Sequence, residues 1–241
     1  GSGSGRACGF ACQGIGCVLM RQAGRNIRQH GGGPVVPHCP APCARYSHPM
    51  AASSHTSGQR FFAGRLLLAL PGIGDTNFDH ATIAMCSHDE HGALGLDVGR
   101  TIVGLGLREL LGNFGIDGSN VPDMPVLRGG PVEPQRGFVL HSADWGGERM
   151  FQIGREWRLS GSLDILKAIA EGRGPSRYAV ALGYVGWSAG QLEAEMARHG
   201  WFLGAEYTGD LVSDLAEMRW SRGFAASGVD ARLLAGHSGT A

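Results

Sequence analysis

Apolar residues occur in short, bounded runs along most of the chain, and their spacing predicts strands more often than helices. Four runs of seven to ten residues are closed by glycine, proline or polar residues, as buried strands usually are, and they lie at residues 61–70, 81–87, 92–98 and 178–185. The second and third runs flank a polar segment from Ser87 to Gly92, whose residues favour a tight turn. These two runs are therefore predicted to form an antiparallel hairpin.

Two segments in the middle of the chain have the spacing of helices instead. Residues 162–171 begin with Ser162 in the N-cap position and end before Gly172. Residues 105–114 place four apolar side chains on one helix face, at Leu107, Leu110, Leu111 and Phe114. Strands and helices alternate irregularly and one strand pair is antiparallel. The pattern therefore predicts a mixed α+β domain rather than a doubly wound parallel sheet.

Residues 1–58 differ in composition from the rest of the chain. They are rich in Gly, Ser, Pro, Cys and Arg, contain no acidic residue and show no apolar periodicity. Such a segment cannot bury enough surface to offset its ordering entropy, so we expect a disordered leader before one folded domain at residues 59–241. An over-extended gene start is an alternative origin of this leader. Four cysteines have a spacing that zinc tolerates, but few apolar residues surround them and no metal site is predicted: Cys8, Cys12, Cys39 and Cys43.

The predicted domain is acidic, with 15 basic and 21 acidic residues from Phe61 onward. This balance counts against a broad electrostatic affinity for nucleic acid. No run of apolar residues approaches the ~20 that cross a bilayer. Cys86 is the only cysteine of the domain, which fits a reducing compartment. We therefore expect a cytoplasmic protein with no membrane partner and no cofactor.

Three segments together resemble the AlgH/YqgE family of bacterial proteins. They are Gly-Gly-Pro-Val at residues 129–132, Gly-Phe-Val-Leu-His at residues 137–141, and the run from Tyr178 to Trp201 with its Gly-Trp-x-x-Gly-Gln-Leu-Glu stretch. The resemblance implies a single compact domain with a small barrel-like sheet and a loosely defined role in regulating transcription, without an agreed reaction. The family pattern also has a His matching His88 before a Gly-Ala-x-Gly stretch. Its usual Asn-Arg-Pro is absent here, so no role of that Asn is carried over.

The segment Gly186-Trp187-Ser188-Ala189-Gly190 matches G-x-S-x-G between a strand and a helix, where a nucleophilic serine could act in a hydrolase. A loop like that of His30-Gly31-Gly32-Gly33 supplies oxyanion donors in some esterases, but no apolar run precedes it here. The same serine also begins a capping box with Gln191, which predicts a helix N-cap instead. We favour the cap, because only two histidines follow the serine: His199 and His237.

Several other polar positions are candidate binding residues. Gly129 and Gly130, assisted by Arg136, could present backbone N–H groups to an anion, although a rigid turn between strands is the favoured interpretation. His141 ends a short strand and could be a general base, although a local hydrogen bond is more usual. His88 and His91 are expected to point into water from a tight turn.

The residues around the third predicted helix complete the candidate set. Trp187 and Trp201 bracket this helix and are expected to anchor the core, while Trp187 could also line a pocket. Gln191 and Glu193 match the family's polar positions. We therefore expect a non-enzymatic binding or regulatory protein that meets a protein or a small ligand and acts on transcription indirectly, since no helix-turn-helix is visible. The alternatives are a serine hydrolase using Ser188 and a small-anion or nucleotide-binding protein.

Overall fold

The computed structural model of the protein describes residues 62–147, 150–198 and 200–234. The predicted leader and its cysteines lie outside these ranges. So do His30, His199 and His237. Nothing in the structure therefore tests the disorder, the zinc alternative or the oxyanion loop considered above.

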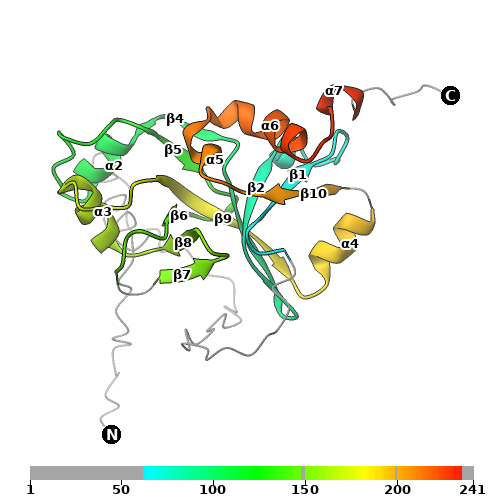
Figure 1. Cartoon of the computed structure of the whole chain (residues 1–241), viewed down its shortest axis with the longest axis horizontal. Coiled ribbons are helices and arrows are strands. Elements are labelled where there is room, and N and C mark those ends of the chain that lie inside the picture. Colours follow the sequence, from blue (N-terminus) through cyan, green and yellow to red (C-terminus); the bar gives the residue numbers. More distant parts are fainter. Residues whose placement is uncertain (1–61, 148–149, 199, 235–241) are drawn as a thin grey trace, which may run out of the picture.

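A sheet of ten strands forms the body of the molecule and curls into half of a barrel (Figure 1). Its main path has the order β10-β1-β2-β3-β9-β6-β8-β7, and β5 joins β9 to β4. Neighbouring strands are antiparallel except β5 and β9, which run parallel. The predicted α+β class is thus confirmed. The strands are β1 (Arg65–Ala69), β2 (Thr82–Asp89), β3 (Gly92–Asp97), β4 (Thr101–Gly106), β5 (Pro125–Arg128), β6 (Val132–Ser142), β7 (Met150–Ile153), β8 (Trp157–Ser160), β9 (Tyr178–Ser188) and β10 (Trp201–Glu206).

Short helices cover the curled sheet in three places. In Figure 1, α2 and α3 lie together at one end of the molecule. Helix α4 lies between the end of β9 and the start of β10, and α6 lies near β1. Within the described ranges, no helix is long and apolar enough to cross a membrane. The helices are α2 (Leu107–Asn113), α3 (Leu163–Ala170), α4 (Gln191–Ala197), α5 (Asp210–Ser213), α6 (Arg219–Ala226) and α7 (Ala231–Leu234), with 3-10 turns η1 (Thr76–Phe78) and η2 (Ala216–Met218).

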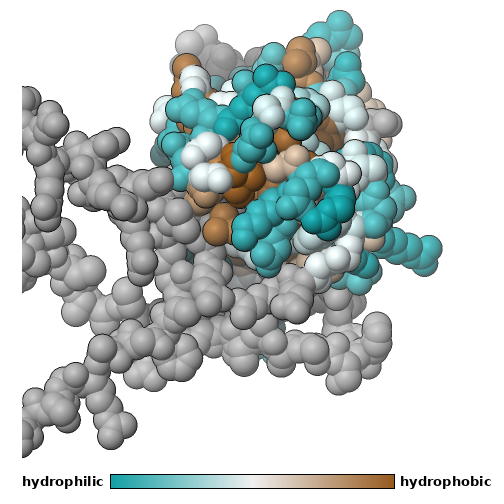
Figure 2. Space-filling view, turned by 90° about the vertical axis from the view of Figure 1, so that its left-hand side faces the viewer, coloured by the Kyte–Doolittle hydropathy of each residue, from teal (hydrophilic) through white to brown (hydrophobic). Residues whose placement is uncertain are grey.

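Each group of helices encloses its own cluster of buried side chains. Helices α2 and α3 contribute Leu110 and Ile165 to one cluster against β5, β6 and β9. Helix α4 contributes Leu192 to a second, and α6 contributes Phe224 to the third. The apolar side chains predicted to share one face of the helix at residues 105–114 therefore do face the core. Figure 2 shows the end of the molecule that carries α2 and α3. Most of the coloured surface there is hydrophilic, and a small hydrophobic patch lies near its centre.

The predicted hairpin is present, with β2 and β3 paired antiparallel around the turn before Gly92. Two strand ends were predicted wrongly. Strand β9 does not end at Val185 but continues to Ser188, because its last four residues pair with β3. Strand β6 begins at Val132 instead of Gly137, and His141 lies one residue before its last residue, Ser142.

The side chains of two adjacent residues at the start of α6 connect this helix to the sheet through hydrogen bonds. Arg219, at the start of α6, donates hydrogen bonds to the carbonyl oxygens of Val98 at 2.6 Å, Asp214 at 2.9 Å and Val212 at 3.2 Å. Next to it, Trp220 Nε1 donates to the carbonyl of Ala69 at 2.8 Å. Burial lowers the pKa of Arg219, and its three carbonyl acceptors satisfy donors that would otherwise be costly to bury.

Candidate functional site

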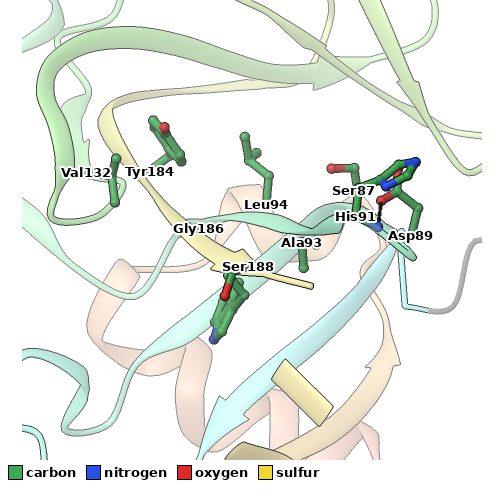
Figure 3. A pocket seen from close by; sticks show the side chains of 11 residues that line it. Ser87, Asp89, His91, Ala93, Leu94, Val132, Tyr184, Gly186 and Ser188 are labelled. Carbon is green, nitrogen blue, oxygen red and sulfur yellow. Dashed lines mark hydrogen bonds between the residues drawn. The ribbon is translucent and has the colours of Figure 1, made fainter. Parts of the chain in front are cut away.

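A pocket of about 350 Å³ lies on one face of the sheet, between the tip of the β2–β3 hairpin and the end of β9. Figure 3 shows Val132 and Tyr184 at one end of it, Leu94 in the middle, and Asp89 and His91 at the other end. The described residues that line it are Ser87, Asp89, His91, Gly92, Ala93, Leu94, Val132, Tyr184, Gly186, Trp187 and Ser188.

Strand pairing explains why this place is hollow. Leu94 of β3 pairs with Ser87 of β2 on one side and with Gly186 of β9 on the other. Paired residues point to the same face of a sheet, so these three positions form one row under the pocket. Gly186 brings no side chain to the row, and the missing side chain leaves room for a ligand.

The side chains of the next row across the same strands point to the opposite face, toward α4, although Ala93 and Trp187 of this row also border the pocket. It consists of His88, Ala93 and Trp187, which pair with one another across β2, β3 and β9. His88 is only 4% exposed, and its Nε2 lies 2.9 Å from Oε1 of Glu193 in α4. The prediction that His88 points into water from a turn was wrong. Its strand extends to Asp89, and the alternation of side chains along that strand turns His88 inward.

A carboxylate that the sequence interpretation did not single out organises the contact between α4 and the sheet. Glu195 Oε2 accepts hydrogen bonds from the indole Nε1 of both Trp187 and Trp201, each at 2.9 Å. Glu195 Oε1 accepts from Gln191 Nε2, also at 2.9 Å. Both tryptophans are buried, as predicted. A glutamate one helical turn after Gln191 was the available signal, but the sequence does not show that two distant indoles meet there.

Ser188 is not the N-cap of α4, which corrects the capping-box prediction. The cap position is Gly190, in the left-handed region at φ 73°, and no side chain of the described residues caps the helix. Gln191 Oε1 instead accepts hydrogen bonds from the Ser188 backbone N–H at 3.0 Å and from its hydroxyl at 3.1 Å. Pairing of Ser188 with Gly92 keeps the serine in the strand, and the reversal at Gly190 starts the helix. Ser188 thus joins the pocket to α4.

Gly129 and Gly130 lie where the chain crosses β9 in direct backbone contact. A Cβ on Gly130 would lie 2.2 Å from the Tyr184 carbonyl, and one on Gly183 would lie 2.3 Å from the Gly130 carbonyl. The Gly129 N–H donates to the Leu182 carbonyl at 2.8 Å. Close packing therefore accounts for these glycines, and the proposed anion contact would have to compete with that backbone bond.

Arg136 is held beside the same crossing. Its guanidinium lies 3.4 Å from the Glu133 carboxylate and 5.2 Å from the centre of the Phe138 ring. Glu133 also accepts from the Tyr184 hydroxyl at 3.2 Å. An anion at Arg136 would have to share this ion pair, and anion binding here stays a prediction.

His141 is fully buried and lies apart from the pocket. Its Nδ1 is 2.9 Å from the Ser142 carbonyl, and its Nε2 is 2.9 Å from the Ser160 hydroxyl. Because a carbonyl only accepts, Nδ1 carries the proton of the first bond. Burial lowers the pKa of His141, despite an opposing effect of the Ser142 bond. The local hydrogen bond expected for this residue is present.

In the part of the chain that the structure describes, no group of three or more His, Cys, Asp or Glu side chains could hold a metal. Cys86 is buried, and its burial raises the pKa of the thiol to about 12, which keeps it protonated and unreactive. Of the candidate residues, Trp187, Gln191 and Glu193 meet around α4, whereas Gly129, Gly130 and Arg136 form a separate group.

The fold and the pocket define a single curled-sheet α+β protein with a small concave site beside its longest strand pair. The chain belongs to the AlgH-like family, whose model matches residues 66–232, and this confirms the resemblance seen in the sequence. It is 55% identical over 185 residues to a UPF0301 protein of Novosphingobium aromaticivorans, a match that covers 77% of this chain and all of the relative. A UPF0301 protein of Sphingopyxis alaskensis is 54% identical, over 75% of this chain and 97% of its own length.

Solved structures show the same architecture. The solution structure of the AlgH protein from Pseudomonas aeruginosa superposes with a TM-score of 0.60 and 34% identity, covering 78% of this chain and all of that protein. A crystal structure of a Corynebacterium diphtheriae protein has a TM-score of 0.59 over 75% of this chain and 94% of its own, at 17% identity, and shares the fold.

Proposed function

We propose that this protein is a non-catalytic, cytoplasmic binding protein that receives a small ligand in the pocket between β3 and β9 and acts on transcription indirectly. The observation that carries the proposal is a convergence in space. Three separate segments that bear the family resemblance supply walls of one pocket: Gly92-Ala93-Leu94, Val132, and Gly186-Trp187. A concave site with apolar walls and a few polar groups is the usual form of a ligand site.

The contacts behind the pocket support a regulatory role. Ser188 lines the pocket and holds Gln191, while Gln191 donates to the Glu195 carboxylate that joins two tryptophans. A ligand that draws the Ser188 hydroxyl away from Gln191 would change the bonding of α4 to the sheet. A ligand shifts a conformational equilibrium only through such a difference in contacts. Helix α4 is therefore the element expected to report occupancy to a protein partner.

The same geometry supports binding over hydrolysis. The Ser188 hydroxyl donates to an amide oxygen, which cannot take up its proton as a general base would. His141, the histidine considered as a base, is buried and forms hydrogen bonds with Ser142 and Ser160. These bonds occupy both ring nitrogens. The alternative of a nucleophilic Ser188 is therefore not the function that we propose.

Filling the pocket tests the proposal. In Gly186→Leu the new Cβ would meet only the Tyr184 ring, at 3.3 Å, so the fold should persist while the pocket is occupied. We would titrate the neutral probe 2-phenylethanol and follow the backbone amide signals of Gly92 and Gly186. Saturable shifts are expected in the wild type and are expected to vanish in Gly186→Leu.

The matched control is Gly112→Leu, which adds the same side chain where no atom of the described residues lies within 4 Å of the new Cβ. This variant should bind the probe like the wild type. Shifts that are equal in all three proteins would show that the probe binds elsewhere. Such a result would overturn the assignment of the ligand site.

A further inference from the structure

The pocket has one fixed charge at one of its ends. Among the described residues that line it, Asp89 is the only one of the Asp, Glu, Lys and Arg types. The carboxylate is held in place, because its Oδ1 accepts the His91 backbone N–H at 2.8 Å. Its remaining acceptor capacity is available at the pocket end, where Figure 3 shows Asp89 beside His91.

The other end of the pocket is apolar, and the described residues that line it include no Lys or Arg. Val132 and the Tyr184 ring form its walls, and Figure 3 places Leu94 between them and Asp89. The nearby guanidinium of Arg136 is paired with Glu133 and lies over the Phe138 ring. Negative charge in the ligand would therefore meet the Asp89 carboxylate without a lining Arg or Lys to offset it.

From this asymmetry, and resting on the proposed function, we propose that the ligand carries a cationic nitrogen on an apolar group. The nitrogen, an ammonium or a guanidinium, pairs with Asp89. The apolar group lies against Leu94, Val132 and Tyr184. A charge-assisted bond to a carboxylate is stronger than a neutral one, so this contact sets the preference among ligands of similar shape. A free amine and a basic side chain of a peptide share this chemistry.

A matched pair of probes tests the charge preference. Phenethylamine and 3-phenylpropionate share a phenyl ring and a two-carbon linker, and they differ in the sign of the terminal charge. Ligands of this size bind in the millimolar range, which amide titrations can measure. We expect the wild type to prefer the amine by about fivefold or more, as for one ion pair near a protein surface.

Two isosteric variants separate the role of Asp89 from the general charge of the hairpin tip. Asp89→Asn keeps the Oδ1 acceptor for His91 and removes the charge, so the amine preference should fall to about one. Glu90→Gln removes the same charge from the neighbouring residue, which does not line the pocket, and should leave the preference unchanged. An equal loss in both variants, or a wild type that prefers the acid, would overturn the proposal.

The design also distinguishes the two proposals from each other. If Gly186→Leu leaves the binding of both probes intact, the assignment of this pocket as the ligand site is wrong. If it blocks both probes while Asp89→Asn leaves the amine preference intact, only the charge assignment is wrong. A blocked Phe-Arg dipeptide added to the series identifies the source of the cation. Binding tighter than that of phenethylamine points to a peptide partner, and weaker binding points to a free amine.

Discussion

The imidazole Nε2 of buried His88 lies 2.9 Å from the carboxylate of Glu193, a residue 105 positions later in the chain. This contact joins the β2–β3 hairpin to α4, and the Phe62 ring lies 4.7 Å from the same imidazole. The hairpin that forms one wall of the pocket is therefore tied, on its reverse face, to the helix that Ser188 contacts through Gln191. Pocket and helix share one stretch of sheet.

Breaking the His88–Glu193 contact should loosen α4 without unfolding the protein. Glu193 is half exposed, so water replaces part of what Glu193→Ala removes, and a loss of about 1 kcal/mol is expected. A double-mutant cycle with His88→Phe, measured by urea unfolding, should give a coupling energy of roughly 0.5–1.5 kcal/mol. Strict additivity of the two single changes would contradict a direct interaction.

Glu195 should matter more than Glu193, because it satisfies two buried indole N–H groups at once. Glu195→Leu leaves both the Trp187 and the Trp201 donors without their acceptor, and a loss of roughly 2–4 kcal/mol in unfolding free energy is expected. Glu195→Gln retains an acceptor oxygen and is the matched control, with a smaller loss. Equal losses in the two variants would show that the charge, and not the acceptor, stabilises this contact.

Close backbone packing predicts that Gly130 cannot be replaced. In Gly130→Ala the new Cβ would overlap the Tyr184 carbonyl, so a loss above about 3 kcal/mol, or failure to fold, is expected. Gly112→Ala, in the open part of α2, should instead gain up to about 1 kcal/mol. Thermal unfolding of the two variants measures the contrast. A fully stable Gly130→Ala protein would refute the crossing.

Asp97 should make stability depend on pH. Its burial raises the pKa to about 6, although the Gly99 N–H and Arg100 oppose the rise. A raised pKa means that the folded state binds the proton more tightly. The associated stability is therefore complete below about pH 4 and is lost as the pH rises toward 6, by at most roughly 3 kcal/mol. Urea unfolding between pH 4 and 7 should show this slope in the wild type and a flatter one in Asp97→Asn.

Ser188→Ala should have little effect on stability, because Gln191 still accepts the backbone N–H of residue 188. A loss below about 1 kcal/mol is expected, whereas Gln191→Leu removes the one oxygen that accepts from both Ser188 donors and should cost more. Intact mass after treatment with a fluorophosphonate should show no adduct on the wild type. Stoichiometric labelling that is lost in Ser188→Ala would make the protein a serine hydrolase and refute its assignment as non-catalytic.

Local sequence was sufficient for the elements whose signals are local. The apolar face of residues 107–111 and the turn before Gly92 each depend on neighbours a few residues apart, and both are present. Family membership also followed from ordered stretches of sequence. Strand ends did not, because pairing with a distant strand decides them. Residues 186–188 remain extended because β3 lies alongside, which no local pattern around Gly186 indicates.

The sequence by itself determined the α+β class, the main helices and the set of residues from which a site could be built. Only the tertiary structure decided which of them meet. It turned His88 inward to Glu193, placed two indoles on Glu195 and brought Asp89 and Gly186 to one pocket. Side-chain direction along a strand alternates with every residue, and strand partners come from far along the chain. The position of a site on a curled sheet therefore depends on long-range pairing, which local spacing does not encode.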